Sequence, residues 1–145
     1  MKSFRVAALG LIAFASPSFA GVFTDDLSRC LVEKTSAEDK TALVQWIFVA
    51  MAQHPSVASM TKITPAQVEQ HNKQAGELFM RLLTETCVDT SKKAIKYEGA
   101  VAIQSAFQVL GQAAAGELFV HPDVTKVMSG LEEFLDSKKL EALAQ

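Results

Sequence analysis

The stretch from Gly99 to Gly116, GAVAIQSAFQVLGQAAAG, decides the fold because it contains no charged residue. Its length approaches the roughly 20 residues of a membrane span. However, Gln104, Gln108 and Gln112 recur at every fourth position, and amides without partners would be costly in lipid. We therefore expect the central helix of a bundle. Its expected apolar stripe consists of Ile103, Phe107, Leu110 and Leu118.

Capping motifs predict further helices on both sides of this stretch. Thr64-Pro65-Ala66-Gln67 offers a threonine cap, a proline at the first helical position and a glutamine three residues after the cap. Ser36 and Ser129 open similar patterns, each with an acid three residues later. Another helix is expected to begin near residues 89–91 and to be interrupted at Gly99.

The two His-Pro pairs are interpreted as helix ends. His54-Pro55-Ser56-Val57 and His121-Pro122-Asp123-Val124 each follow an apolar helical segment, and the residue before a proline is disfavoured in a helix. The shared His-Pro-x-Val pattern also leaves open a duplicated helical pair.

The complete pattern predicts an all-α fold. No segment alternates with a period of two, and no Asn-Gly or Asp-Gly hairpin signal occurs. We expect a compact bundle of five or six helices in one domain over residues 21–145. Periodicity fades after Asp136, so the tail is expected to fray or to form a separate short turn.

The only cysteines, Cys30 and Cys87, are expected to form one intrachain disulfide. Cys30 shares an apolar helical face with Leu27 and Leu31, and Cys87 follows Leu83 at four-residue spacing. Closing this loop would stabilise the fold by roughly 4 kcal/mol. An intermolecular pair and a reactive thiol are the alternatives, although no Cys-x-x-Cys motif supports redox chemistry.

The first twenty residues have the pattern of a cleavable secretory signal. Lys2 and Arg5 precede an apolar run over residues 6–14, and small residues stand at Ser18 and Ala20. Cleavage is predicted after Ala20, which places the protein in the periplasm or outside the cell. The apolar run is too short for a stable membrane anchor, and the next residue is Gly21 rather than a cysteine that could carry lipid.

The charge of the chain is mildly acidic. Its formal net charge is −2, and removal of two basic leader residues would leave about −4. A nucleic-acid partner is therefore not expected, because a phosphate backbone selects basic surfaces.

The glutamine stripe is the first candidate binding feature. Gln104, Gln108 and Gln112 could line a groove for a protein partner or a small apolar ligand, or they could form the solvated edge of a mostly buried helix. Trp46 is offset from the apolar face that contains Leu43, so it is a candidate for contact with a partner or with a second core neighbour.

A metal or cofactor site on His54 and His121, with His71 as a further member, is the alternative. None of the histidines has a metal-binding spacing such as His-x-x-x-His, and no cofactor is expected. If the histidines have only a structural role, His54 and His121 are expected to cap helix C-termini. His71 is then expected to be hydrogen-bonded in the core.

Catalysis has the least support in the sequence. The chain has no Gly-x-Ser-x-Gly elbow and no phosphate-binding glycine loop, and the acid pairs at residues 25–26 and 132–133 fit helix first turns. The expectation is an exported helical binding protein without catalytic activity. A hydrolase with a site assembled by the fold is the second alternative, and no pattern indicates the oligomeric state.

Overall fold

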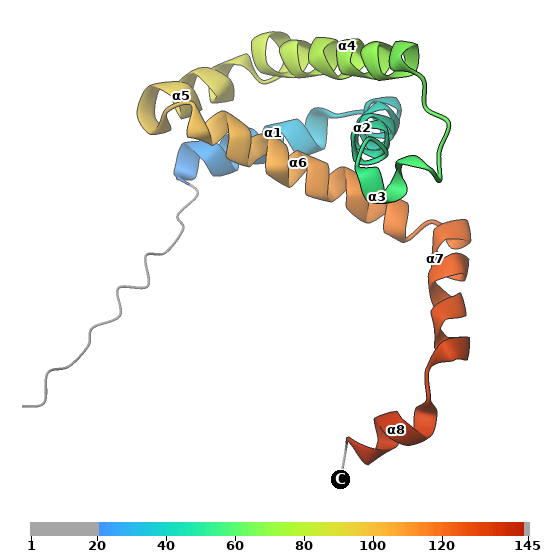
Figure 1. Ribbon diagram of the computed structural model, residues 1–145. Coiled ribbons are helices and arrows are strands. Elements are labelled where there is room, and N and C mark those ends of the chain that lie inside the picture. The colour runs from blue at the N-terminus through green and yellow to red at the C-terminus, as the bar shows by residue number, and fades with distance from the viewer. Residues whose placement is uncertain (1–20, 144–145) are drawn as a thin grey trace, which may run out of the picture.

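The computed structural model of the chain describes residues 21–143, and over this range it contains helices and no strand (Figure 1). The longer helices are α1 (Val22–Lys34), α2 (Ala37–Met51), α4 (Pro65–Arg81), α5 (Val88–Glu98) and α6 (Val101–Phe119). The shorter helices are α3 (Pro55–Ala58), α7 (Pro122–Ser129) and α8 (Ser137–Ala142). A π-helical turn, Leu82–Thr86, joins α4 to α5, and a 3-10 turn, Gly130–Phe134, follows α7.

The predicted all-α class is confirmed. The short helices raise the number above the five or six expected, since the described residues contain eight. The predicted signal peptide and its cleavage site lie in residues 1–20, outside the described range.

Helix α6 is the central helix, as its uncharged sequence predicted, and it packs against α1, α2 and α5. The apolar stripe differs from the expected one: Ile103 and Phe107 are only half-buried, and Leu118 is exposed. Small side chains are buried instead, because they let the neighbouring helices approach the α6 backbone closely. The buried positions, spaced by four, are Ala102, Ala106, Leu110 and Ala114.

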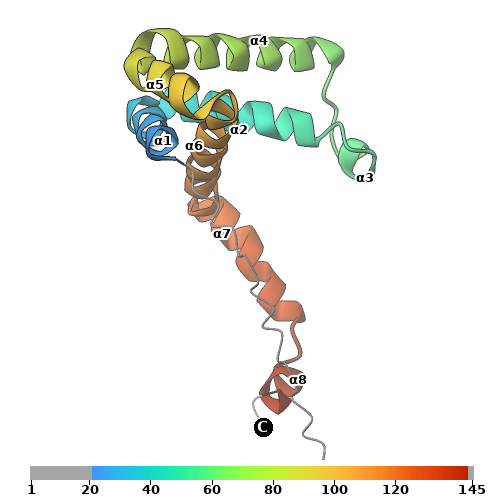
Figure 2. The same cartoon turned by 90° about the vertical axis from the view of Figure 1, so that its left-hand side faces the viewer.

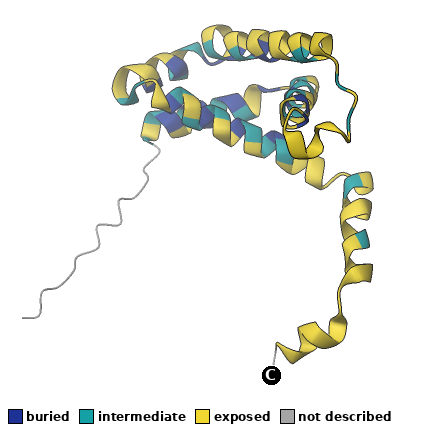
Figure 3. Cartoon of the chain, in the orientation of Figure 1, coloured by how far each residue is buried: buried dark blue, intermediate teal, exposed yellow. Residues whose placement is uncertain are grey.

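The core is built mainly from leucines on helices that lie far apart in the sequence. Its largest fully buried side chains are Leu27, Leu31, Leu82 and Leu110. The buried residues lie on the inner sides of α1, α2, α4, α5 and α6, as Figure 3 shows.

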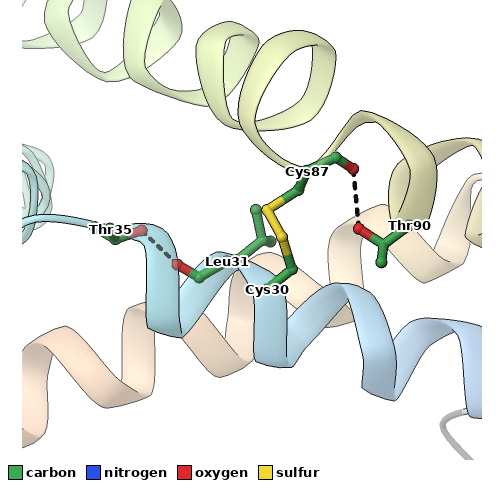
Figure 4. Close-up of a disulfide and its surroundings, with 5 residues drawn as sticks. All are labelled: Cys30, Leu31, Thr35, Cys87 and Thr90. Carbon is green, nitrogen blue, oxygen red and sulfur yellow. Dashed lines mark hydrogen bonds between the residues drawn. A yellow bond between two sulfur atoms is a disulfide. The ribbon is translucent and has the colours of Figure 1, made fainter.

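The predicted disulfide between Cys30 and Cys87 is confirmed (Figure 4). Its Cα atoms are 6.0 Å apart, within the usual range for such bonds. It joins the middle of α1 to the residue that follows the π-helical turn. Thr90 Oγ1 donates to the Cys87 carbonyl at 2.9 Å, which fixes the start of α5 beside the bond.

Two of the predicted helix caps form as expected. Ser36 and Thr64 each accept a hydrogen bond from the third residue of their helix, and the side chains of Asp39 and Gln67 return the bond. Gly99 ends α5 with a φ of 80°, a conformation that glycine adopts readily. The prediction for Ser129 was wrong, because its hydroxyl donates to the Thr125 carbonyl within α7.

The apolar helices end just before the His-Pro pairs, at Met51 and Phe119, as expected, but the histidines cap the start of the next helix and not the end of the previous one. Nδ1 of His54 accepts from the Ser56 N–H, and Nδ1 of His121 accepts from the Asp123 N–H, both at 3.3 Å. Each proline then occupies the first turn of its helix, where its missing N–H has no helical partner to lose. The repeated sequence is therefore a repeated N-capping device.

Beyond α6 the chain leaves the packed helices, as both cartoon views show (Figures 1 and 2). We call residues 21–119 the body and residues 120–143 the C-terminal arm. The arm is almost entirely exposed (Figure 3), and its uncovered large apolar side chains include Val127, Met128, Leu131 and Phe134.

Candidate functional site

A groove of about 340 Å³ lies where α2, α4 and α6 meet. Trp46 and Ile47 of α2 form one side, Phe79 of α4 another, and α6 supplies Phe107 and both Gln104 and Gln108. The buried side chains of Leu43 and Leu110 also line it. Three helices distant in sequence thus contribute to one concave surface, which we call the aromatic groove.

Three aromatic rings pack in series along this groove. The Trp46 and Phe79 rings meet edge to face with centroids 5.7 Å apart, and Phe79 and Phe107 are tilted with centroids 4.3 Å apart. Trp46 Nε1 donates to Asn72 Oδ1 of α4 at 2.9 Å. Because its polar N–H is satisfied in this way, the indole that lines the groove is held in one orientation.

The glutamines divide into two groups. Gln104 and Gln108 line the aromatic groove, whereas Gln112 does not. All three are exposed, and within residues 21–143 none of their amides is hydrogen-bonded to another protein group. Two amides at the edge of the groove are therefore free to donate to and accept from a ligand.

Two ion pairs hold the helices of the groove together. Arg81 of α4 donates to Asp39 of α2 at 2.7 Å, and Lys40 of α2 donates to Glu117 of α6 at 2.5 Å. Burial alone would raise the pKa of Asp39, but hydrogen bonds from Arg81 and from the Ser36 backbone outweigh it and lower that pKa. The Asp39 carboxylate therefore stays charged at neutral pH, and it ties α4 to α2.

A second groove, of about 390 Å³, is lined mainly by apolar side chains of α2 and α6 and shares Ile47 with the first. It contains Phe48, Met51 and Phe119. Phe48 and Met51 are large apolar residues of the kind that is usually buried, yet they are 57% and 64% exposed. Helix α2 thus presents uncovered apolar side chains on two of its sides.

The aromatic partners of Trp46 could not be identified from the sequence. Phe107 was expected in the apolar stripe of its helix, and Phe79 lies four residues before Leu83 on the apolar side of another helix. Only the packing of α2 against both α4 and α6 brings them to Trp46. The glutamine spacing was the available signal, and it located the α6 side of the groove.

The histidines do not converge. His54 and His121 are exposed caps at two different helix starts. The expected hydrogen bond of His71 is absent: its Nδ1 is buried and has no partner among the described residues. Over residues 21–143, no group of three or more histidine, cysteine, aspartate or glutamate side chains is arranged to hold a metal ion.

Comparison with protein families, with curated proteins and with solved structures yields no match to this chain. The helices of residues 21–143 include none that is both long and apolar enough to cross a membrane.

Proposed function

We propose that this protein is an exported, non-enzymatic binding protein, and that its aromatic groove takes a large apolar side chain of a partner protein. The observation that carries the proposal is the meeting of Trp46, Phe79 and Phe107 with two unpaired amides in one groove. Aromatic side chains that stay accessible in a pocket are typical anchors of protein interfaces.

The chemistry of the groove favours a peptide segment over other ligands. A glutamine amide both donates and accepts, as a peptide group does, so Gln104 and Gln108 can pair with the main chain beside an inserted side chain. The apolar lining of Leu43 and Leu110 suits a leucine or phenylalanine. A second apolar groove along the same helix pair offers a further position for a longer segment.

Export is supported by two independent features. The first twenty residues have a basic start, an apolar run and small residues before Gly21. The Cys30–Cys87 bond belongs to oxidising compartments such as the periplasm and the extracellular space. We therefore assign the partner to the same compartments.

Trp46 provides the test because it is the only tryptophan in the chain. Blocked pentapeptides of alanine with leucine, phenylalanine or alanine at the centre would be titrated against the protein while Trp46 emission is followed. We expect saturable changes with leucine and phenylalanine but not with the all-alanine peptide. Gln108→Ala should weaken binding by about fivefold, since one hydrogen bond contributes about 1 kcal/mol.

Gln112→Ala is the matched control, because Gln112 lies on the same stripe but outside the groove. It should bind like the unaltered protein, whereas Phe107→Ala should lose the response. Oleate, titrated in parallel, represents a small apolar ligand. If only oleate saturates the protein, the groove binds a small apolar ligand and not a peptide. If no probe gives a saturable response, the assignment of the groove as a binding site is wrong.

A further inference from the structure

The first turn of α1 is held by a side chain from α5. Glu98 accepts from the Phe23 N–H at 2.9 Å with Oε1, and from the Thr24 N–H at 2.9 Å and the Thr24 hydroxyl at 2.5 Å with Oε2. The residue at the cap position, Gly21, has no side chain to bind these groups. Glu98 therefore satisfies helix N–H groups that a local cap would otherwise bind.

Gly21 lies directly against this carboxylate. Its φ of −68° and ψ of 162° are open to any residue, so backbone conformation does not require glycine here. A Cβ at this position would come within 2.5 Å of Glu98 Oε2 and closer still to Oε1. The absence of a side chain is thus what lets the carboxylate reach α1.

The Gly21 nitrogen is close to the same group. Two bonds of about 1.5 Å each separate it from the Cβ position that overlaps Oε1, so nitrogen and carboxylate lie within about 5 Å. An ammonium at that distance from a carboxylate is within range of a direct ionic interaction.

We propose that Glu98 is the binding site for the α-amino group that removal of the leader creates at Gly21. The inference rests on the proposed export, with cleavage of the Ala20–Gly21 bond. A peptidase adds water across that bond, so that Ala20 takes the hydroxyl and becomes a carboxylate while Gly21 gains an amine. At neutral pH the amine is mostly protonated, which replaces a neutral amide with a cation beside Glu98.

The surroundings explain why this cation needs Glu98. A positive charge at a helix N-terminus opposes the helix dipole, and the carboxylate offsets that repulsion. The other titratable groups on neighbouring turns are Asp25 and Asp26 of α1 and Lys96 and Tyr97 of α5. The first three turns of α6, which packs against α1, contain no titratable residue. Glu98 is the carboxylate next to Gly21. Removal of the leader therefore strengthens the interaction that holds α1 against α5.

The test uses the full chain, expressed with its own leader in a Gram-negative host and purified after export. Intact mass should show a mature chain that begins at Gly21. NMR titration of the Gly21 α-amine should then give a pKa raised on the order of 1 unit in the unaltered protein relative to Glu98→Gln. Gly21→Ala, whose Cβ displaces the carboxylate, should behave like Glu98→Gln.

Thr24→Val is the control variant, because it removes a hydroxyl donor to Glu98 but keeps the carboxylate. It should retain the raised pKa of the amine, and it remains informative if Glu98→Gln fails to fold. An exported chain that begins elsewhere, or an amine that titrates alike with and without the Glu98 carboxylate, would overturn the inference. Neither result concerns the aromatic groove, which the Trp46 titration tests separately.

Discussion

The body and the C-terminal arm have similar apolar sequence patterns but differ in how far their apolar side chains are buried. Both place large apolar residues at helical spacing, and both form helices. In the body these residues find partners, and Leu110 is only 1% exposed. In the arm they find none, and Leu131 is 64% and Phe134 84% exposed. Amphipathic periodicity thus specifies a helix, but the apolar face of that helix is buried only where another helix packs against it.

Two features that the arm lacks stabilise the packing of the body. The first is the Cys30–Cys87 bond, which holds α1 against the turn before α5. The second is the buried alanine face of α6, which permits close packing against α1 and α5. The arm contains helices of 8 and 6 residues, shorter than the roughly 12 residues that an isolated helix needs for stability.

The largest expected difference between the two regions concerns the disulfide. Replacing both Cys30 and Cys87 with alanine should lower the free energy of unfolding by roughly 4 kcal/mol, because the bond closes a loop of 57 residues. Urea denaturation followed by circular dichroism measures the loss. A decrease below about 1 kcal/mol would mean that packing alone holds the body together.

The second largest difference between the two regions should come from replacing one leucine in each of them. Leu110→Ala removes a fully buried side chain and should cost about 3 kcal/mol of unfolding free energy. Leu131→Ala makes the same chemical change in the arm and should alter that free energy by no more than about 0.5 kcal/mol. Equal losses would show that the apolar face of the arm is covered in solution.

The smallest expected effect is the pH dependence of the α1 anchor. The Thr24 hydroxyl and the N–H groups of Phe23 and Thr24 lower the pKa of Glu98 below its ordinary value of 4.5. Its stabilising contribution is therefore present above pH 4.5 and is lost as the pH falls through the lower folded-state pKa. Glu98→Gln should flatten the acid side of the stability profile, whereas Glu141→Gln, on the arm, should leave it unchanged.

Local signals in the sequence predicted the local structure well. The caps at Ser36 and Thr64 formed because each depends on residues within one turn. The disulfide followed from the number of cysteines and from their positions beside apolar stripes. The His-Pro pairs were correctly interpreted as helix ends, but the capping role of their histidines was wrong, because proline disfavours the helix before it and also favours a new helix after it.

The candidate site was only partly accessible from sequence for a geometric reason. The glutamine spacing pointed to one side of the groove, but the position of Phe79 depends on how α4 crosses α2. The contact of Glu98 with α1 spans 75 residues, and neither end has a distinctive motif. Long-range pairings of this kind arise from packing angles that periodicity does not encode.

We propose that the aromatic groove of the body, and not the apolar face of the arm, binds an apolar peptide. Hydrogen exchange by mass spectrometry, with and without the leucine-centred pentapeptide, tests it most directly. We expect slower exchange in α2 and in the Gln104–Gly111 part of α6, with no change in residues 120–143. Slower exchange confined to the arm, or no change anywhere at saturating peptide, would contradict it.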